Sequence, residues 1–376
     1  MNPISDTEFQ QLIEWAIEIQ QIPAPTFSES NRAAWLAQCL RDLGIPEVRQ
    51  DEAGNVLARL PGGTEAPLLI TAHMDSVHSV KQNLGIVRTP YTVTGAGIGD
   101  NALGVAALVS MAASFTHSGA PPAGDIWFIG TVGEEGLGNL KGIKAIVPNF
   151  TTPPHCTIVL EGIGLGQIQQ RALGIIRQRI TVQSPGGHSW SDYGSPSAIH
   201  ILVELAASIE SIKIPTHPRT SLNIGVIRGG TTINSIAPCA FMEIDLRSEE
   251  PETLTTLAGY IKKKTETIQQ EGVSVTLEEI GNRPSGSIPA NDPFLAFGAK
   301  VLVNLGVPPR FIISSTDASY LIHKHWPVLS IGLTTGSHVH TPEETIDLLP
   351  LHVGIQQLRQ MAAEIWSVKT VKSDIS

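Results

Sequence analysis

Cysteine is scarce in this sequence, and its spacing excludes two common uses of the residue. The 376-residue chain has three cysteines, Cys39, Cys156 and Cys239, which are far apart and form no Cys-x-x-Cys pair. An odd number of widely separated cysteines supports neither a disulfide framework nor a thiolate zinc site. We therefore expect free, buried thiols.

Long hydrophobic runs and a secretion signal are also absent. Met1–Ile22 contains four acidic residues and no Lys or Arg, so it lacks the basic start and the apolar centre of a signal peptide. The longest nearly unbroken apolar stretch, Gly104–Phe115, has about a dozen residues, fewer than the roughly 18 that span a bilayer. We expect a cytoplasmic protein that does not bind membranes.

Basic residues are outnumbered by acidic ones, 25 to 35, which gives a formal net charge of −10. Binding to nucleic acid or to an anionic membrane needs clustered Lys and Arg, so neither partner is expected. Hydrophobic residues make up 41% of the chain, which is a globular composition. The length exceeds one ordinary domain of roughly 100–200 residues, so we expect two domains or one domain with an insertion.

The first part of the chain has the pattern of an α/β domain. Two amphipathic helices are predicted at Asp6–Gln21 and Asn31–Leu43, because apolar side chains recur with a period close to 3.6. Aliphatic runs without alternation follow, separated by helical patterns such as Gly104–Thr116. Such strands belong to a sheet that is covered on both faces. The predicted strands are Asn55–Leu60, Pro67–Ala72, Asp125–Gly130 and Thr157–Leu160.

The segment 175–283 has a different pattern, with alternating strands around two helices. Its β-α-β-β-α-β order is typical of a small ferredoxin-like sandwich. The sequence therefore predicts a discontinuous α/β domain, residues 1–174 and 284–376, with an inserted α+β domain of residues 175–283. The inserted strands are Ile175–Gln183, Ser221–Arg228, Ala240–Arg247 and Val273–Glu279, and the helices are Ser197–Ile212 and Glu252–Gln270.

Histidines and carboxylates follow the ends of the predicted strands, where open α/β sheets build their sites. The second strand continues into His73 and Asp75, which share a strand face, so Asp75 can orient the His73 imidazole. Glu134 and Glu135 follow the strand Ile126–Val132. Their side chains project in different directions, so one can bind a cation while the other stays free as a base.

Three further candidates complete the set. Asp100 lies in the glycine-rich stretch Gly95–Gly104 before an apolar helix. Asp100 or Asn101 could cap that helix, and a phosphate-binding loop is another interpretation, although the Lys of a Walker loop is missing. Glu161 ends a strand, and His340 lies near the C-terminus.

These donors have the chemistry of a metal site. Two imidazoles and three carboxylates suit Zn²⁺ or a similar first-row ion and exclude an all-oxygen Mg²⁺ cage. If one carboxylate bridges, five ligands serve two ions, roughly 3.5–4 Å apart, that can activate water and polarise a carbonyl group. The five donors are His73, Asp100, Glu135, Glu161 and His340.

In their order and separations, these motifs resemble the dizinc exopeptidase and deacylase family that includes peptidase T, glutamate carboxypeptidase, aminoacylase and acetylornithine deacetylase. The resemblance covers nearly the whole chain and implies a zinc-exopeptidase fold with a lid. It implies that Asp100 bridges, that His73 and Glu161 hold one ion, and that Glu135 and His340 hold the other. The matching residues are His73–Val77, Asp100 with Asn101, Glu134 with Glu135, Glu161, and His340–Glu344.

The resemblance also assigns roles around the ions. Glu134 would be the general base, Asp75 would orient His73, and the peptide bond after Asp100 would be cis. The cofactors would be two Zn²⁺ ions, with Co²⁺ or Mn²⁺ as alternatives. His338 competes with His340 as a ligand, but only His340 begins the family's His-x-x-x-Glu motif.

The inserted domain resembles the family's lid or dimerisation domain, which implies a homodimer through this domain. Pro185–Ser189 matches a Gly-Gly-His turn, so His188 would stabilise the oxyanion at a neighbouring active site. Asn234 lies in a matching motif and would help to hold the substrate. Arg247 could bind the substrate carboxylate, or it could form a structural ion pair.

We therefore predict a metallopeptidase that cleaves short peptides near the amino terminus. The Gly-x-Gly-Asp-Asn stretch ending at Asn101 favours a peptidase T-like subtype. The alternatives are an N-acyl amino-acid deacylase or carboxypeptidase of the same family, and a catalytically silent, metal-stabilised binding protein.

Overall fold

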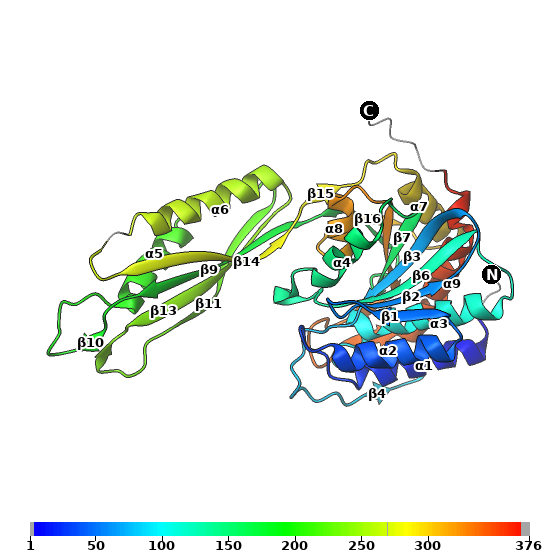
Figure 1. The fold of residues 1–376 in the computed structure, drawn as a ribbon, viewed down its shortest axis with the longest axis horizontal. Coiled ribbons are helices and arrows are strands. Elements are labelled where there is room, and N and C mark those ends of the chain that lie inside the picture. The colour runs from blue at the N-terminus through cyan, green and yellow to red at the C-terminus, as the bar shows by residue number, and fades with distance from the viewer. Residues whose placement is uncertain (1–3, 269, 370–376) are drawn as a thin grey trace. The chain divides into compact units, whose positions relative to one another are not determined.

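The computed structural model describes residues 4–268 and 270–369, and the chain forms two compact units (Figure 1). The main unit comprises Met1–Ala172 and Ser287–Ser376, and the inserted unit comprises Leu173–Gly286. The sequence predicts boundaries at 174/175 and 283/284, whereas the two units of the structure divide at 172/173 and 286/287. Each unit has its own hydrophobic core.

A nine-stranded mixed sheet forms the centre of the main unit, which confirms the predicted α/β fold class. Its order is β1-β2-β6-β3-β7-β17-β8-β15, and β16 pairs with β8. The neighbours β6, β3, β7 and β17 are parallel. The strands are β1 (Glu47–Gln50), β2 (Val56–Leu60), β3 (Glu65–His73), β6 (Gly124–Thr131), β7 (Cys156–Ile163), β8 (Gln167–Ala172), β15 (Gly286–Ser287), β16 (Arg310–Ser314) and β17 (Val328–Thr334).

Helices cover both faces of this sheet. Along β3, Leu68 and Ile70 belong to one core cluster and Leu69 to the other, so consecutive residues must be apolar. One face packs against α1 (Asp6–Gln20), α2 (Ser30–Asp42), α3 (Gly104–His117), α7 (Pro293–Asn304) and α9 (Leu348–Glu364), and the other against α4 (Lys141–Ile146) and α8 (Asp317–His323). Short helical turns are η1 (Ile98–Leu103), η2 (Gly136–Gly138), η3 (Val147–Asn149) and η4 (Ile365–Ser367).

Two of these helices illustrate how the local sequence sets their form. At the start of α1, the Ser5 hydroxyl accepts a hydrogen bond from the Glu8 N–H, and the Glu8 carboxylate accepts one from the Ser5 N–H. The segment Ile98–His117 is long and apolar enough to cross a membrane, but 83% of its apolar window is buried. Because α3 contacts α1 and β3, it is a core helix of the main unit.

A second, small sheet brings two distant loops of the main unit together. Its order is β18-β19-β5-β4. Thr94 of β5 pairs with Thr345 of β19, 251 residues later, so the loop after β5 lies beside the loop before β19. The strands are β4 (Val87–Arg88), β5 (Thr92–Thr94), β18 (Gly336–Ser337) and β19 (Thr345–Asp347).

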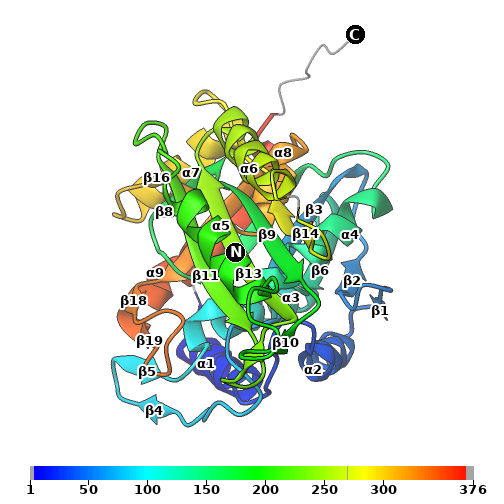
Figure 2. The ribbon, with the colours of Figure 1, turned by 90° about the vertical axis from the view of Figure 1, so that its left-hand side faces the viewer.

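The inserted unit is a four-stranded antiparallel sheet, in the order β11-β13-β9-β14, with two helices packed on one face (Figures 1 and 2). Along β9, Ile180 and Val182 face the helices and Thr181 does not, which is the alternation of a sheet covered on one side. The main elements are β9 (Gly174–Gln183), α5 (Ala198–Glu210), β11 (Thr220–Gly229), β13 (Cys239–Ser248), α6 (Pro251–Glu266) and β14 (Ser274–Arg283).

Two expectations for this part of the chain need correction. The helix predicted over 252–270 ends at Glu266, where β-branched Thr267 and Ile268 follow, and residue 269 lies outside the described residues. All three cysteines are free, but only Cys156 is buried, and Cys239 is exposed at the start of β13. The prediction of buried thiols is therefore wrong for Cys239, because its side chain lies on the uncovered face of the sheet.

Candidate dinuclear metal site

The five predicted donors come together at the carboxyl ends of the parallel strands of the main unit. His73 is the last residue of β3, Glu135 follows β6, and Glu161 lies near the end of β7. Asp100 lies in η1, and His340 lies in the loop between β18 and β19. The strand order and the small sheet therefore explain why residues separated by more than 200 positions meet.

Asp100 is at the centre of this group. Its Oδ1 atom is 3.0 Å from His73 Nε2, and its Oδ2 atom is 3.0 Å from His340 Nε2. Glu161 Oε2 is 3.9 Å from His73 Nε2, and Glu135 Oε1 is 3.3 Å from His340 Nε2. The Asp100 carboxylate thus contacts both histidines. Each histidine also lies near a second carboxylate, Glu161 beside His73 and Glu135 beside His340.

This arrangement fits a pair of cations. Ligand atoms lie within 4.8 Å of one another in the set His73, Asp100 and Glu161, and in the set Asp100, Glu135 and His340. Asp100 belongs to both sets. Glu161 Oε1 is buried and has no hydrogen-bond partner among the described residues, as expected of an oxygen that binds a metal ion. The residues could therefore hold two ions that share Asp100.

The Asp75 carboxylate accepts hydrogen bonds from the backbone around the site. It is fully buried, its Oδ1 atom accepts a hydrogen bond from the Glu134 N–H, and its Oδ2 atom accepts one from the Glu135 N–H, both at 2.9 Å. Its Oδ1 atom is also 3.4 Å from His73 Nδ1. Burial alone would raise the pKa of Asp75, but the interactions with His73 and the two N–H groups lower it. Asp75 therefore holds the backbone of the glutamate pair, and its carboxylate lies close to the His73 imidazole.

The loop that carries Asp100 is packed against β7. The Asn101 side chain donates a hydrogen bond to the Leu160 carbonyl at 2.8 Å, and the bond between Asp100 and Asn101 is cis, as expected. A Cβ atom on Gly162 would lie 1.9 Å from the Gly99 carbonyl oxygen, so only glycine fits there. In the described residues no side-chain hydrogen bond caps the start of α3, so the expectation that Asp100 or Asn101 caps this helix is wrong.

Protonation of the ion-free site follows from this crowding. Burial favours neutral His73, but its contacts with the carboxylates of Asp100 and Asp75 outweigh burial and raise its pKa well above the ordinary value. Hydrogen bonds with Asp100 and Glu135 raise the pKa of His340 to about 10. Burial raises the pKa of Glu161 to about 8. We therefore expect these three groups to carry protons at neutral pH when no ion is bound.

The two C-terminal histidines differ in their surroundings. His340 faces Asp100 and Glu135, whereas the His338 imidazole pairs with its neighbour Ser337 at 3.0 Å. His338 belongs to none of the metal-compatible groups of the described residues. The geometry therefore favours His340 over His338.

The sequence pattern of the peptidase family M20/M25/M40 matches residues 69–364. The chain belongs to this family. It is accordingly a hydrolase of the metallopeptidase and amidohydrolase type, which acts on peptide or amide bonds.

Solved structures share this M20 fold over nearly the whole chain. A tripeptidase from Staphylococcus aureus has a TM-score of 0.77 at 23% identity, and 95% of this chain and 98% of that one are covered. A dinuclear metal-binding M20 peptidase from Bacillus subtilis has a TM-score of 0.67 at 17% identity, with 98% and 100% covered. A probable carboxypeptidase from Aspergillus flavus is 23% identical over 322 residues, 77% of this chain and 75% of its own.

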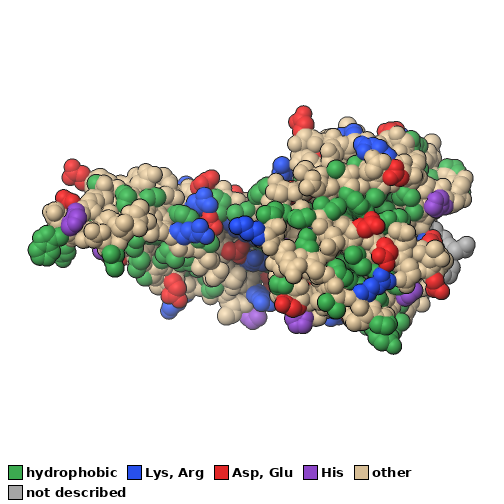
Figure 3. Space-filling view, turned by 90° about the horizontal axis from the view of Figure 1, so that it is seen from below, with side chains coloured by type: hydrophobic (Ala, Val, Ile, Leu, Met, Phe, Trp, Pro, Cys, Tyr) green, Lys and Arg blue, Asp and Glu red, His purple; other side chains and the backbone are tan. Residues whose placement is uncertain are grey.

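In the inserted unit of this M20 chain, a loop pair brings two predicted residues together. β10 (Gly187–His188) pairs with β12 (Ser235–Ile236), and the Ser189 N–H donates a hydrogen bond to the Asn234 carbonyl at 3.0 Å. His188 and Asn234 are both exposed. Figure 3 shows hydrophobic side chains at one end of the inserted unit. In the segment that follows His188, the side chains of Trp190 and Tyr193 are 87% and 90% exposed.

The backbone defines the tautomer of His188. Its Nδ1 atom accepts hydrogen bonds from the N–H groups of Trp190 and Ser191 at 3.2 and 3.4 Å. An acceptor Nδ1 in a neutral imidazole leaves the proton on Nε2. His188 therefore presents an exposed N–H donor.

Arg247 lies in a different part of the inserted unit. It follows Cys239 by eight residues along β13, a separation of about 26 Å at the usual rise of a strand. Its Nε atom donates to Asp245 Oδ1 at 2.7 Å. The structure thus contains the ion pair that was the alternative reading, and Arg247 does not join His188 and Asn234.

Three residues before β1 support the site, and none of them is among the residues predicted from the sequence. The Thr26 hydroxyl donates to Asp75 Oδ2 at 2.9 Å, and Glu29 Oε1 accepts the Gly133 N–H at 3.0 Å. Buried Arg32 donates to the Met74 carbonyl at 2.9 Å. A signal existed only for Arg32, which lies four residues before Leu36 and so puts a charge on the apolar face of α2.

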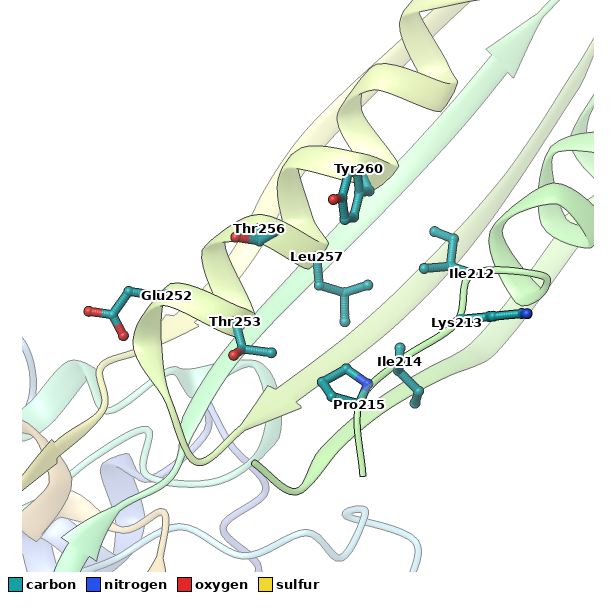
Figure 4. Close-up of a pocket in the computed structure, with 9 residues that line it drawn as sticks. All are labelled: Ile212, Lys213, Ile214, Pro215, Glu252, Thr253, Thr256, Leu257 and Tyr260. Atoms are coloured by element: carbon teal, nitrogen blue, oxygen red, sulfur yellow. The ribbon is translucent and has the colours of Figure 1, made fainter. Parts of the chain in front are cut away.

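The inserted unit also has a pocket of about 290 Å³ between α6 and the segment after α5 (Figure 4). Its apolar lining includes Leu257 and Ile214, and Lys213 and Glu252 lie at its edges. None of the ten predicted site residues lines this pocket.

Metal binding to this site is expected to release about three protons at pH 7, one each from His73, His340 and Glu161, because ligands must be deprotonated. Apparent affinity should therefore rise with pH while these groups are protonated in the ion-free protein. Isothermal titration of Zn²⁺ in two buffers with different ionisation enthalpies measures the number. His340→Gln should lower the number of released protons by one, and the control His338→Gln should leave it unchanged. Binding heats that are equal in both buffers would show that no protons are released and would contradict the prediction.

Proposed function

We propose that this M20 enzyme is a dizinc exopeptidase that hydrolyses short peptides near their amino terminus. The observation that carries the proposal is the position of the Asp100 carboxylate, which lies between a pair formed by His73 and Glu161 and a pair formed by His340 and Glu135. Glu134 lies next to this group. Glu134 is buried and its ligand atom lies within 4.8 Å of those of His73 and Glu135. A carboxylate so close to two cation sites, and not needed as a ligand, is suited to proton transfer.

The proposed ligands are His73 and Glu161 for one ion, Glu135 and His340 for the other, and Asp100 for both. Imidazole and carboxylate donors favour Zn²⁺, and Co²⁺ or Mn²⁺ would also fit. Two such ions, when bound, would polarise the scissile carbonyl and lower the pKa of a water molecule.

The chain's own groups would then carry the proton. Glu134 would take it from the attacking water and deliver it to the leaving amine. Asp75 would keep the N–H groups of Glu134 and Glu135 in position, so that base and ligand hold their orientation. His73 would be held in one tautomer by the same carboxylate.

The inserted unit is proposed to supply groups that bind the substrate. His188 has an exposed Nε2–H suited to donate a hydrogen bond to a developing oxyanion. Asn234 lies beside it and could bind the peptide backbone. In this proposal the inserted unit is a lid and dimerisation domain, and the enzyme acts as a homodimer. Arg247 is a weaker candidate for the substrate carboxylate because it is paired with Asp245.

The preference for short peptides is supported by the likeness to a tripeptidase structure and by the Gly-x-Gly-Asp-Asn stretch. An N-acyl amino-acid deacylase or a carboxypeptidase is the main alternative, because the water chemistry is the same and a probable carboxypeptidase is among the relatives. A silent binding protein is disfavoured because Glu134 and all five donors are present. The free thiols are consistent with a reducing, cytoplasmic compartment.

Incubation of the zinc-loaded protein with a tripeptide, a dipeptide and an N-acetyl amino acid tests the proposal. We expect release of the N-terminal residue from the tripeptide, with the highest kcat/KM of the three. An N-acetylated tripeptide of the same sequence is the matched control and should not be cleaved, because its amino group is blocked. Turnover of the acylated compounds alone would end the peptidase proposal in favour of a deacylase.

A further inference from the structure

Glu344 is a fully buried carboxylate that contacts both halves of the metal site through the backbone. Its Oε1 atom accepts hydrogen bonds from the N–H groups of Gly99 and Asp100, at 2.6 and 2.7 Å. Its Oε2 atom accepts the His340 N–H at 3.3 Å. One side chain therefore joins the peptide of the shared ligand to the peptide of a terminal ligand, 240 residues away in the chain.

The loop held by Glu344 has a backbone that needs support. His338 and His340 have φ values of +57° and +67°, in the left-handed region that residues other than glycine rarely adopt. Within the loop, the Thr341 N–H bonds to the His338 carbonyl, and the Glu344 N–H bonds to the Thr341 carbonyl. The Gly95 N–H donates to the Glu344 carbonyl at 2.8 Å, which fastens this loop to the glycine-rich stretch.

A purely apolar residue could fill the same space, but it could not accept these three N–H groups. Buried N–H groups that lose their acceptor are costly, so both loops would rearrange without Glu344. Small shifts matter here because Asp100 must face His73 and His340 at once. Glu344 itself belongs to none of the metal-compatible groups of the described residues, so its contribution acts through the backbone.

We propose that Glu344 is a positioning residue, which holds the Asp100 and His340 peptides in the relative place that two ions require. This inference rests on the proposed two-metal site. It differs from a packing role, because it predicts loss of metal affinity and not only of stability. It also differs from the role of a metal ligand, because an uncharged side chain with an oxygen acceptor, as in Glu344→Gln, should preserve part of the positioning effect.

The test compares Glu344→Ala and Glu344→Gln with the control Glu343→Gln, which removes the neighbouring exposed carboxylate. In the ion-free protein, hydrogen exchange of residues 95–103 should be at least about tenfold faster in Glu344→Ala. Apparent affinity for Co²⁺ should fall about 10–100-fold, the usual effect of losing a group that orients ligands. The visible spectrum of bound Co²⁺ should change, and kcat should fall more than KM rises.

Glu344→Gln keeps an oxygen that can accept the Gly99 and Asp100 N–H groups, while its amide would face the His340 N–H. It should therefore restore protection at 95–103 and bind Co²⁺ with intermediate affinity. Glu344→Ala with a lower melting temperature but wild-type Co²⁺ affinity and spectrum would overturn the inference. Should Glu344→Ala fail to fold, Glu344→Gln decides the question. Wild-type hydrogen exchange, wild-type Co²⁺ affinity and an unchanged visible spectrum of bound Co²⁺ in Glu344→Gln would also overturn the inference. Failure of the wild-type protein to bind two ions would instead refute the proposed site itself.

Discussion

Replacing Glu134 by Gln is expected to lower peptide hydrolysis by at least about 10²-fold while both ions stay bound. The amide has the shape of the carboxylate but cannot accept a proton from water. Glu134 belongs to a third metal-compatible set, with His73 and Glu135, but to neither of the two sets that share Asp100, so we expect the binding of both ions to survive. The backbone also should not move, because the Glu134 N–H bond to Asp75 does not involve the replaced group.

Metal content by mass spectrometry under native conditions, together with kcat on the preferred tripeptide, checks this prediction. Glu135→Gln is the matched comparison, because the neighbouring side chain is a proposed ligand. It should lose affinity for one ion, and added zinc should restore part of its activity. No zinc concentration should restore Glu134→Gln. Wild-type turnover in Glu134→Gln would remove Glu134 from the mechanism.

Much of the main unit could be predicted because its signals are local. The strand β3 reads as an unbroken apolar run because both its faces are buried, and His73 follows directly at its carboxyl end. Glu135 and Glu161 could be grouped with it because neighbouring parallel strands end at the same edge of a sheet. The imidazole and carboxylate donors then predict two cations from their chemistry alone.

The parts that escaped prediction depend on contacts between distant segments. The pairing of β5 with β19 involves strands of three residues each, too short to give a periodic signal. That pairing lets the Glu344 carboxylate reach Gly99, a contact that no spacing rule contains. Thr26 supports Asp75 from a loop that looks ordinary in the sequence. Exposure also could not be predicted for Cys239, which depends on which face of β13 the helices cover.

Replacing Asp100 by Asn should have the other large effect, the loss of both ions together with activity. The carboxylate is the group that both ligand sets share, so its charge cannot be supplied by another residue. Removing one partner of a buried ion pair costs about 3–5 kcal/mol, which corresponds to about 10²–10⁴-fold in affinity. Hydrolysis at limiting zinc should fall at least as far.

The ion-free protein gives a second readout for Asp100→Asn. Hydrogen bonds and charges of His340 and His73 lower the pKa of Asp100, although burial alone would raise it. Without this carboxylate the pKa values of both histidines should fall, which NMR titration of the imidazole protons can follow. Glu343→Gln removes an exposed charge from the same loop and should change neither affinity nor these titrations. If Asp100→Asn bound two ions as tightly as the wild type, the ions would not share Asp100, and its proposed role as the ligand of both ions would have to be abandoned.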